Sequence, residues 1–200
     1  MKRLLILFAI LTIVAFPMFA IGSSLDVGIN LSYNTGDDIV DESAYSGLFN
    51  MEKVALGLEL RTNISNFQIA INGDLTILDT ESLLFSGIFG AGFCVDMFKY
   101  LKVSATLGPK VNYVYKGDVK SVDDEGNLVN AKSFINALES GTFYYRFMVD
   151  FLAGPVITMG LAYTIPTIFT IKDGNYSDIL PRREDFKEGQ VSLCMQMKLF

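Results

Sequence analysis

The residues that could carry chemistry in this chain are two cysteines and a set of charged side chains, because the sequence contains no histidine. Without histidine the chain cannot form a Ser/His/Asp triad, a Cys/His pair or a histidine-ligated metal site. Neighbouring carboxylates such as Asp123 and Asp124 could share a proton, but in an acidic stretch they are more often solvated separately. The segment "DDEGN" at 123–127 is too short for a calcium loop and is predicted to be a turn. We therefore expect that the chain is not an enzyme and that it binds neither a metal ion nor a cofactor.

The first residues have the layout of a secretory signal peptide. A basic start precedes an unbroken apolar run at 4–16, and the small residues typical of a cleavage site follow at Ala20 and Gly22. The predicted organisation is a signal peptide over residues 1–22 and one domain over 23–200. An uncleaved signal anchor is the alternative.

The rest of the chain is apolar in a pattern that favours strands. Half of all residues are hydrophobic (50%), yet no later apolar run approaches the roughly 20 residues that a spanning helix needs. Apolar and polar residues alternate instead, with the period of two that is typical of a half-buried strand. Eight segments show this alternation: 25–33, 53–61, 67–77, 85–96, 101–115, 143–151, 157–165 and 190–199.

In lipid only helices and closed barrels satisfy their backbone hydrogen bonds. The export signal, the apolar composition and the eight strand segments, an even number, therefore predict an all-β fold. This fold is an eight-stranded antiparallel up-and-down transmembrane β-barrel. The alternative is a soluble two-sheet sandwich with the aromatic residues in its core.

The predicted connections alternate in length. Three are short, "TNIS", "FKY" and "AGP", and they interleave with three long polar ones and with the short "DTES". Outer-membrane barrels have short periplasmic turns and longer outer loops, so the long connections are predicted to lie outside the cell. Most of the chain's acidic residues fall in them, either to keep the loops solvated or to form a docking surface for cations or a host ligand.

With this architecture the chain resembles the small eight-stranded outer-membrane barrels, the OmpA, OmpX and OmpW-like group. The resemblance implies an outer-membrane location in a Gram-negative-type (diderm) bacterium and a monomeric state. It implies outer-membrane lipid and the barrel-assembly machinery as partners, with no nucleic acid and with an extracellular ligand left unidentified. It also implies that Phe200 is the assembly signal. In the usual signal the apolar positions share the phase of the terminal Phe, whereas Gln196 and Lys198 hold those places here.

The charged residues of the strands fall at positions predicted to face the lumen. An eight-stranded barrel is just wide enough to be filled by side chains, and an unpaired buried charge costs several kcal/mol. Oppositely charged groups in the lumen should therefore pair, which predicts a plugged barrel that serves structure and surface display. The predicted lumen-facing charges are Asp26, Lys53, Glu59, Arg61, Asp74, Asp96, Lys102, Lys110, Arg146, Asp150 and Lys198.

Two alternatives to the plugged barrel are a narrow channel and a soluble barrel. A channel for small or hydrophobic solutes, which the OmpW-like resemblance implies, would use the inward apolar residues Ile88, Met148 and Leu152. A soluble periplasmic ligand-binding barrel is the third possibility.

Cys94 and Cys194 would form a disulfide by default in an exported protein. They are predicted to lie on the fourth and eighth strands, which stand opposite each other when eight strands close. Because a disulfide needs its two Cα atoms within about 7 Å, the sequence predicts two unbridged thiols.

Overall fold

The computed structural model describes residues 23–35, 53–78, 81–122, 128–130, 132–172 and 174–199. The predicted signal peptide at 1–22 and Phe200 lie outside these ranges. Within them the chain forms ten strands, one short α-helix and one 3-10 helix. The elements are β1 (Ser23–Asn34), β2 (Val54–Ile64), β3 (Phe67–Ile77), β4 (Leu83–Phe98), β5 (Leu101–Lys116), β6 (Asp118–Val122), β7 (Leu128–Asn130), α2 (Phe134–Ser140), β8 (Phe143–Leu152), β9 (Ile157–Pro166), η2 (Tyr176–Ile179) and β10 (Gln190–Lys198).

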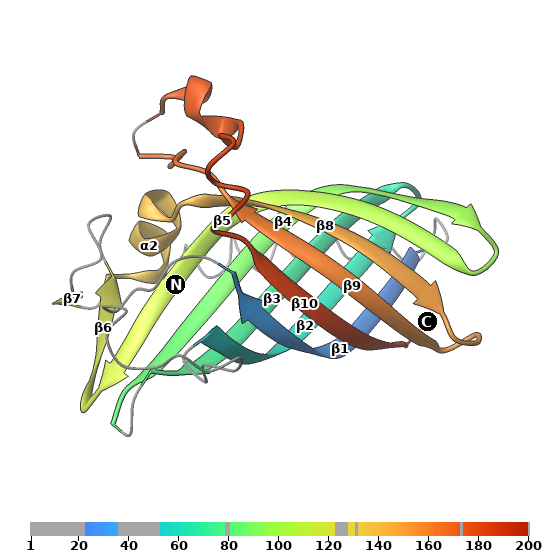
Figure 1. Cartoon of the computed structure of the whole chain (residues 1–200), viewed down its shortest axis with the longest axis horizontal. Helices are drawn as coiled ribbons and strands as arrows, with labels where there is room; N and C mark the ends of the chain where they lie inside the picture. The colour runs from blue at the N-terminus through green and yellow to red at the C-terminus, as the bar shows by residue number, and fades with distance from the viewer. Residues whose placement is uncertain are drawn as a thin grey trace, which may run out of the picture.

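Eight of these strands close into an antiparallel barrel, which confirms the predicted fold class. Their order is β4-β3-β2-β1-β10-β9-β8-β5, and an additional β4–β5 pairing completes the ring (Figure 1). A closed ring removes the free sheet edges that two stacked sheets would leave, so the two-sheet sandwich is wrong. In this ring β2 stands opposite β8, and β4 stands opposite β10. Residues on these strand pairs can therefore meet only across the lumen.

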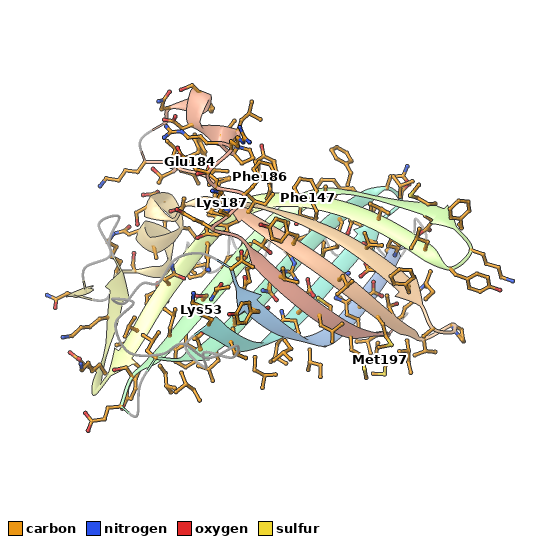
Figure 2. The ribbon with its side chains drawn as sticks, in the orientation of Figure 1. Lys53, Phe147, Glu184, Phe186, Lys187 and Met197 are labelled. Atoms are coloured by element: carbon orange, nitrogen blue, oxygen red, sulfur yellow. The ribbon has the colours of Figure 1, made fainter. Side chains whose placement is uncertain are left out.

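The two faces of the barrel wall differ in polarity. Side chains alternate between the faces along each strand, and the outer face is apolar: Leu58 is 68% exposed and Phe93 is 70% exposed. Figure 2 shows Phe147 and Met197 on the outer side of the wall, and both are exposed. The inner face carries buried polar groups such as Glu59. This distribution is the reverse of that in a soluble domain and is typical of a barrel surrounded by lipid.

The two ends of the barrel differ in their connections, as predicted. At one end β2 and β3 are joined at Ser65 and Asn66, β4 and β5 at Lys99 and Tyr100, and β8 and β9 through 153–156. At the other end lie the long connections, which include β6, β7, α2 and the orange-red segment with η2 (Figure 1). We call these the short-turn end and the long-loop end.

The long-loop end contains ordered structure that the sequence analysis missed. After Gly117, whose φ of 75° suits a residue without a side chain, β6 folds back and pairs with β5 beyond the barrel wall. Helix α2 begins after Ser133, whose hydroxyl accepts a hydrogen bond from the amide of Asn136. The Phe134 ring packs edge-on against Phe89, at 5.3 Å between centroids. No helix in the described ranges is long and apolar enough to span a bilayer.

Residues 167–189 form a second ordered segment at this end, described except for residue 173. It is attached to the barrel where the Tyr163 hydroxyl donates to the Phe186 carbonyl and the Thr35 amide donates to the Gly189 carbonyl at 2.8 Å. Asp185, one of the acidic residues of the predicted outer loops, is buried, and its Oδ2 accepts a 2.6 Å hydrogen bond from the Arg182 amide. The loop acids at 37–42 and 123–125 lie outside the described residues.

Candidate functional site

Four charged side chains meet in the middle of the lumen. Glu59 and Arg61 lie two residues apart on β2, and Arg146 and Asp150 lie four apart on β8, so the period of two turns all of them inward. Arg61 Nη1 is 2.6 Å from Asp150 Oδ2, and Arg61 Nη2 is 3.0 Å from Glu59 Oε2. Arg146 Nη2 is 3.3 Å from Glu59 Oε1, a contact with ion-pair distance but without hydrogen-bond geometry. We call these four residues the central quartet.

The central quartet balances its own charge across the barrel. Two carboxylates face two guanidinium groups, and each residue is no more than 2% exposed. Burying an ion pair is favourable only when the geometry is good and the remaining donors are satisfied, and the planar arginine fork suits two carboxylate partners. Since the Arg61–Asp150 pair connects opposite walls, it bridges the lumen from β2 to β8.

Arg146 extends this network to the neighbouring strands. Its Nη1 donates to Thr164 Oγ1 at 3.0 Å and to Ser192 Oγ at 3.4 Å. Its Nη2 donates to the sulfur of Cys194 at 3.4 Å. These partners lie on β9 and β10, so one arginine connects β8 to both.

An amide-rich group lies on the long-loop side of the central quartet. Asn30 Nδ2 donates to Asn72 Oδ1, and Asn72 Nδ2 donates to Asp74 Oδ1 at 3.1 Å. Gln190 Nε2 donates to the other Asp74 oxygen, Oδ2, also at 3.1 Å. The three strands β1, β3 and β10 supply these residues, and all of the side chains are buried.

A third polar group lies toward the short-turn end. Asn63 Nδ2 donates to Ser24 Oγ and to Asp26 Oδ2, each at 2.9 Å. Gln68 Nε2 in turn donates to Asn63 Oδ1 at 2.7 Å. Together with the central quartet and the amide-rich group, these residues make the lumen polar along most of its length.

The predicted lumen-facing charges divide into three groups by burial. Only part of the set is gathered in the middle of the barrel, because residues near strand ends reach solvent whichever face they point to. Asp96 and Lys198 are exposed at the short-turn end, and Lys110 lies over the Tyr144 ring at 4.9 Å from its centroid. Buried are Asp26, Glu59, Arg61, Asp74, Arg146 and Asp150; half-buried are Lys53, Lys102 and Lys110; exposed are Asp96 and Lys198.

Some of the charges outside the central quartet are neighbours in the strand register. Lys102 on β5 lies between Asp96 on β4 and Asp150 on β8, and Asp26 on β1 lies between Lys198 and Arg61. Opposite charges therefore alternate from strand to strand near the short-turn end.

The sequence analysis singled out charges and missed the neutral amides that bond to these charges or to one another. Asn30, Asn63, Gln68, Asn72 and Gln190 occupy the same inward phase and are each no more than 5% exposed. The sequence could have predicted this, because the five amides fall at inward positions of the strands. A buried amide needs a hydrogen-bond partner, so inward amides were candidates for the lumen network.

Cys94 and Cys194 lie on β4 and β10, on opposite walls of the barrel as predicted. Both thiols are free and buried. Cys194 packs in the lumen with Met148 and Ala162, whereas the Cys94 sulfur lies 3.7 Å from the Ser65 carbonyl oxygen near the short-turn end.

A closed antiparallel barrel with an apolar outer wall and a polar, ion-paired interior is the architecture of a transmembrane β-barrel. No family model and no curated protein matches this sequence.

Solved structures show a distant likeness. The chain is similar to Ail, the attachment invasion locus protein of Yersinia pestis, at 12% identity and a TM-score of 0.48, over 88% of this chain and 97% of that one. It is similar to Neisserial surface protein A at 14% identity and a TM-score of 0.43, over 89% and 97%. A monoaromatic hydrocarbon channel, CymD, follows at 13% identity and a TM-score of 0.29, over 72% and 44%. Likeness at this level carries no inference about function.

Proposed function

We propose that this chain is an integral barrel of the outer membrane of a diderm bacterium, that its lumen is plugged, and that it displays the long-loop end outside the cell. The observation that carries the proposal is the Arg61–Asp150 ion pair, which crosses the lumen at 2.6 Å between opposite walls. A solute would have to separate these buried charges in order to pass.

The energetic argument for a plug follows from burial. Breaking a buried ion pair and leaving one partner uncompensated costs about 3–5 kcal/mol. Glu59, Arg61 and Arg146 are each 1% exposed, so every member of the central quartet depends on the others for its charge balance. Side chains bound in this way fill the lumen instead of lining a pore.

The apolar outer wall supports a membrane location over a soluble periplasmic barrel. Exposed large side chains include Leu58 and Phe93, and contiguous exposed apolar area of this kind is rare on soluble proteins. A lipid environment removes that cost. The partners proposed on this basis are outer-membrane lipid and the machinery that inserts barrels, with a monomer as the functional unit.

Conductance in planar lipid bilayers tests the proposed plug against a narrow channel. The refolded protein should give no reproducible current steps. A Glu59→Ala, Arg61→Ala variant removes the β2 half of the central quartet and should give steps, because the lumen loses both side chains that reach across it.

The matched control removes a different ion pair. Asp118 and Lys120 lie 3.9 Å apart on β6, outside the barrel wall, and their double alanine variant should be as silent as the parent protein. Heat-modifiable gel migration checks that each variant is folded. Reproducible steps from the unmodified protein would contradict the plug and favour the channel.

A further inference from the structure

Asp74 is a buried carboxylate that has no cationic partner among the residues that the structure describes. Its side chain is on β3 in the lumen, and the residue is 4% exposed. Its two oxygens accept hydrogen bonds from the amides of Asn72 and Gln190, both neutral. Among the described residues no ion pair joins Asp74 to a lysine or arginine, whereas Glu59 and Asp150 are both paired. Buried charges in proteins are normally paired or bound to a metal ion.

A second observation is an unpartnered oxygen beside this carboxylate. Asn30 is 1% exposed, its Nδ2 donates to Asn72, and its Oδ1 has no hydrogen-bond partner within the described part of the chain. A methyl group built on Gly57 would collide with both Asn30 Oδ1 and Asp74 Oδ1. The two oxygens therefore converge over the same glycine, with no donor between them.

Reversing the amides does not remove this conflict. Asn30, Asn72 and Asp74 form a ring of three side chains in which each asparagine presents NH₂ to one neighbour and oxygen to the other, while the carboxylate presents only oxygen. If the Asn30 amide is flipped, its NH₂ group faces Asp74 and its oxygen faces Asn72. Asn72 must then be flipped as well, which turns its NH₂ group to Asn30 and its oxygen to Asp74. One contact between two acceptors is left in either arrangement, so only a hydrogen-bond donor or a cation from outside the ring can relieve it, and a cation would also balance the unpaired charge of Asp74.

We propose that a monovalent hard cation binds between Asn30 Oδ1 and Asp74 Oδ1, over Gly57, with sodium as the ion to test. Carboxylate and amide oxygens are the ligands that hard cations prefer. A further unpartnered buried oxygen, Gln190 Oε1, belongs to the amide that already bonds Asp74, and water can complete the shell.

The charge of the site selects a monovalent ion over calcium. Asp74 is the one carboxylate in the amide-rich group, and no group of three or more acidic, cysteine or histidine residues suited to a metal occurs among the residues that the structure describes. Tight calcium sites in proteins use several carboxylates. The absent Gly57 side chain leaves the space over the two oxygens free, which explains why glycine suits this position. The site needs only the closed lumen and does not depend on whether the barrel conducts.

Unfolding of the refolded full-length protein in sodium chloride and in choline chloride, at equal ionic strength, tests the site. A ligand that binds only the folded state stabilises it in proportion to its occupancy, so the urea midpoint should be higher in sodium and should rise with sodium concentration. Asp74→Asn supplies NH₂ to Asn30 Oδ1, so this variant should fold and its midpoint should be the same in the two salts. Asp96→Asn removes an exposed carboxylate at the short-turn end and should keep the full sodium response.

Crystals soaked in thallium(I), a heavy stand-in for a monovalent cation, give a second readout. An anomalous peak between Asn30 and Asp74 is expected in the parent protein and not in Asp74→Asn. Equal midpoints of the parent protein in sodium and choline, or a sodium response that survives in Asp74→Asn, would overturn the proposal. A urea midpoint that changes with pH and does not change with the cation would overturn the proposal as well, because a proton, and not a cation, would then lie between the two oxygens.

Discussion

Arg61 Nη1 and Asp150 Oδ2 lie 2.6 Å apart although their strands, β2 and β8, stand on opposite walls of the barrel. This contact exists only when the barrel is closed with the correct register, because no backbone ladder connects the two strands. The central quartet therefore forms only in the closed barrel. Removing it should lower the free energy of unfolding of the whole barrel.

Asp150→Ala should destabilise the folded barrel by about 3–5 kcal/mol, because Arg61 would lose one of its two carboxylate partners in a buried site. Equilibrium unfolding by urea in detergent micelles or lipid vesicles measures the change. Asp96→Ala is the matched control: this carboxylate is exposed, and exposed substitutions usually change stability by no more than about 0.5 kcal/mol. A similar small change for Asp150→Ala would show that the central quartet is not buried as described.

Leu58→Arg should destabilise the barrel by about 2–4 kcal/mol when it is folded in phospholipid vesicles, because a charge on the lipid face near the bilayer midplane is costly. Leu58 lies near the middle of β2 and is 68% exposed on the outer wall. Glu184→Arg, on the long-loop segment, should be close to neutral. If Leu58→Arg is also neutral in vesicles, the outer wall does not contact hydrocarbon.

Cysteine labels placed at Glu184 or Lys187 should react with a membrane-impermeant maleimide on intact cells, whereas a label at Asn66 should not. The first two are exposed on the segment 167–189 at the long-loop end (Figure 2). Asn66 is exposed in the β2–β3 turn at the short-turn end. The experiment uses a Cys94→Ser, Cys194→Ser background, and permeabilised cells provide the control in which all three sites react. Equal labelling of Asn66 and Glu184 on intact cells would reverse the proposed topology.

The Cys94→Ser, Cys194→Ser variant should itself fold, since the two thiols lie on opposite walls and are unbridged. Heat-modifiable migration of the variant measures folding, and the mass of the unreduced parent protein measures its oxidation state. A mass two hydrogens below the free-thiol value would mean that the cysteines are bonded, which the strand order does not allow.

The strands and their faces could be predicted from the sequence because the signal is local. Along β2, Leu56, Leu58 and Leu60 alternate with Gly57 and Glu59, and a period of two assigns each residue to one side of a sheet whatever its neighbours are. The short and long connections were readable for the same reason, since a loop's length is a property of the sequence itself.

The helix α2 and the hairpin that begins at β6 were missed because their stability comes from contacts beyond their own residues. Seven residues are too few to form a stable helix alone, and α2 is held where Phe134 packs on Phe89 of the barrel wall. A local sequence pattern does not predict a contact of this kind, because the contact depends on the tertiary structure of the barrel wall.

The partners within the lumen were decided by tertiary structure alone. The sequence marked Glu59, Arg61, Arg146 and Asp150 as inward and could not say which carboxylate each arginine would meet, because the answer depends on strand order and register across the whole ring. The same register leaves Asp96 and Lys198 exposed at a strand end, although their phase is inward. It also brings Asn30 and Asp74, from different strands, to the same side of Gly57. Period-two alternation fixes a direction for each side chain, and only closure of the barrel fixes the distances between them.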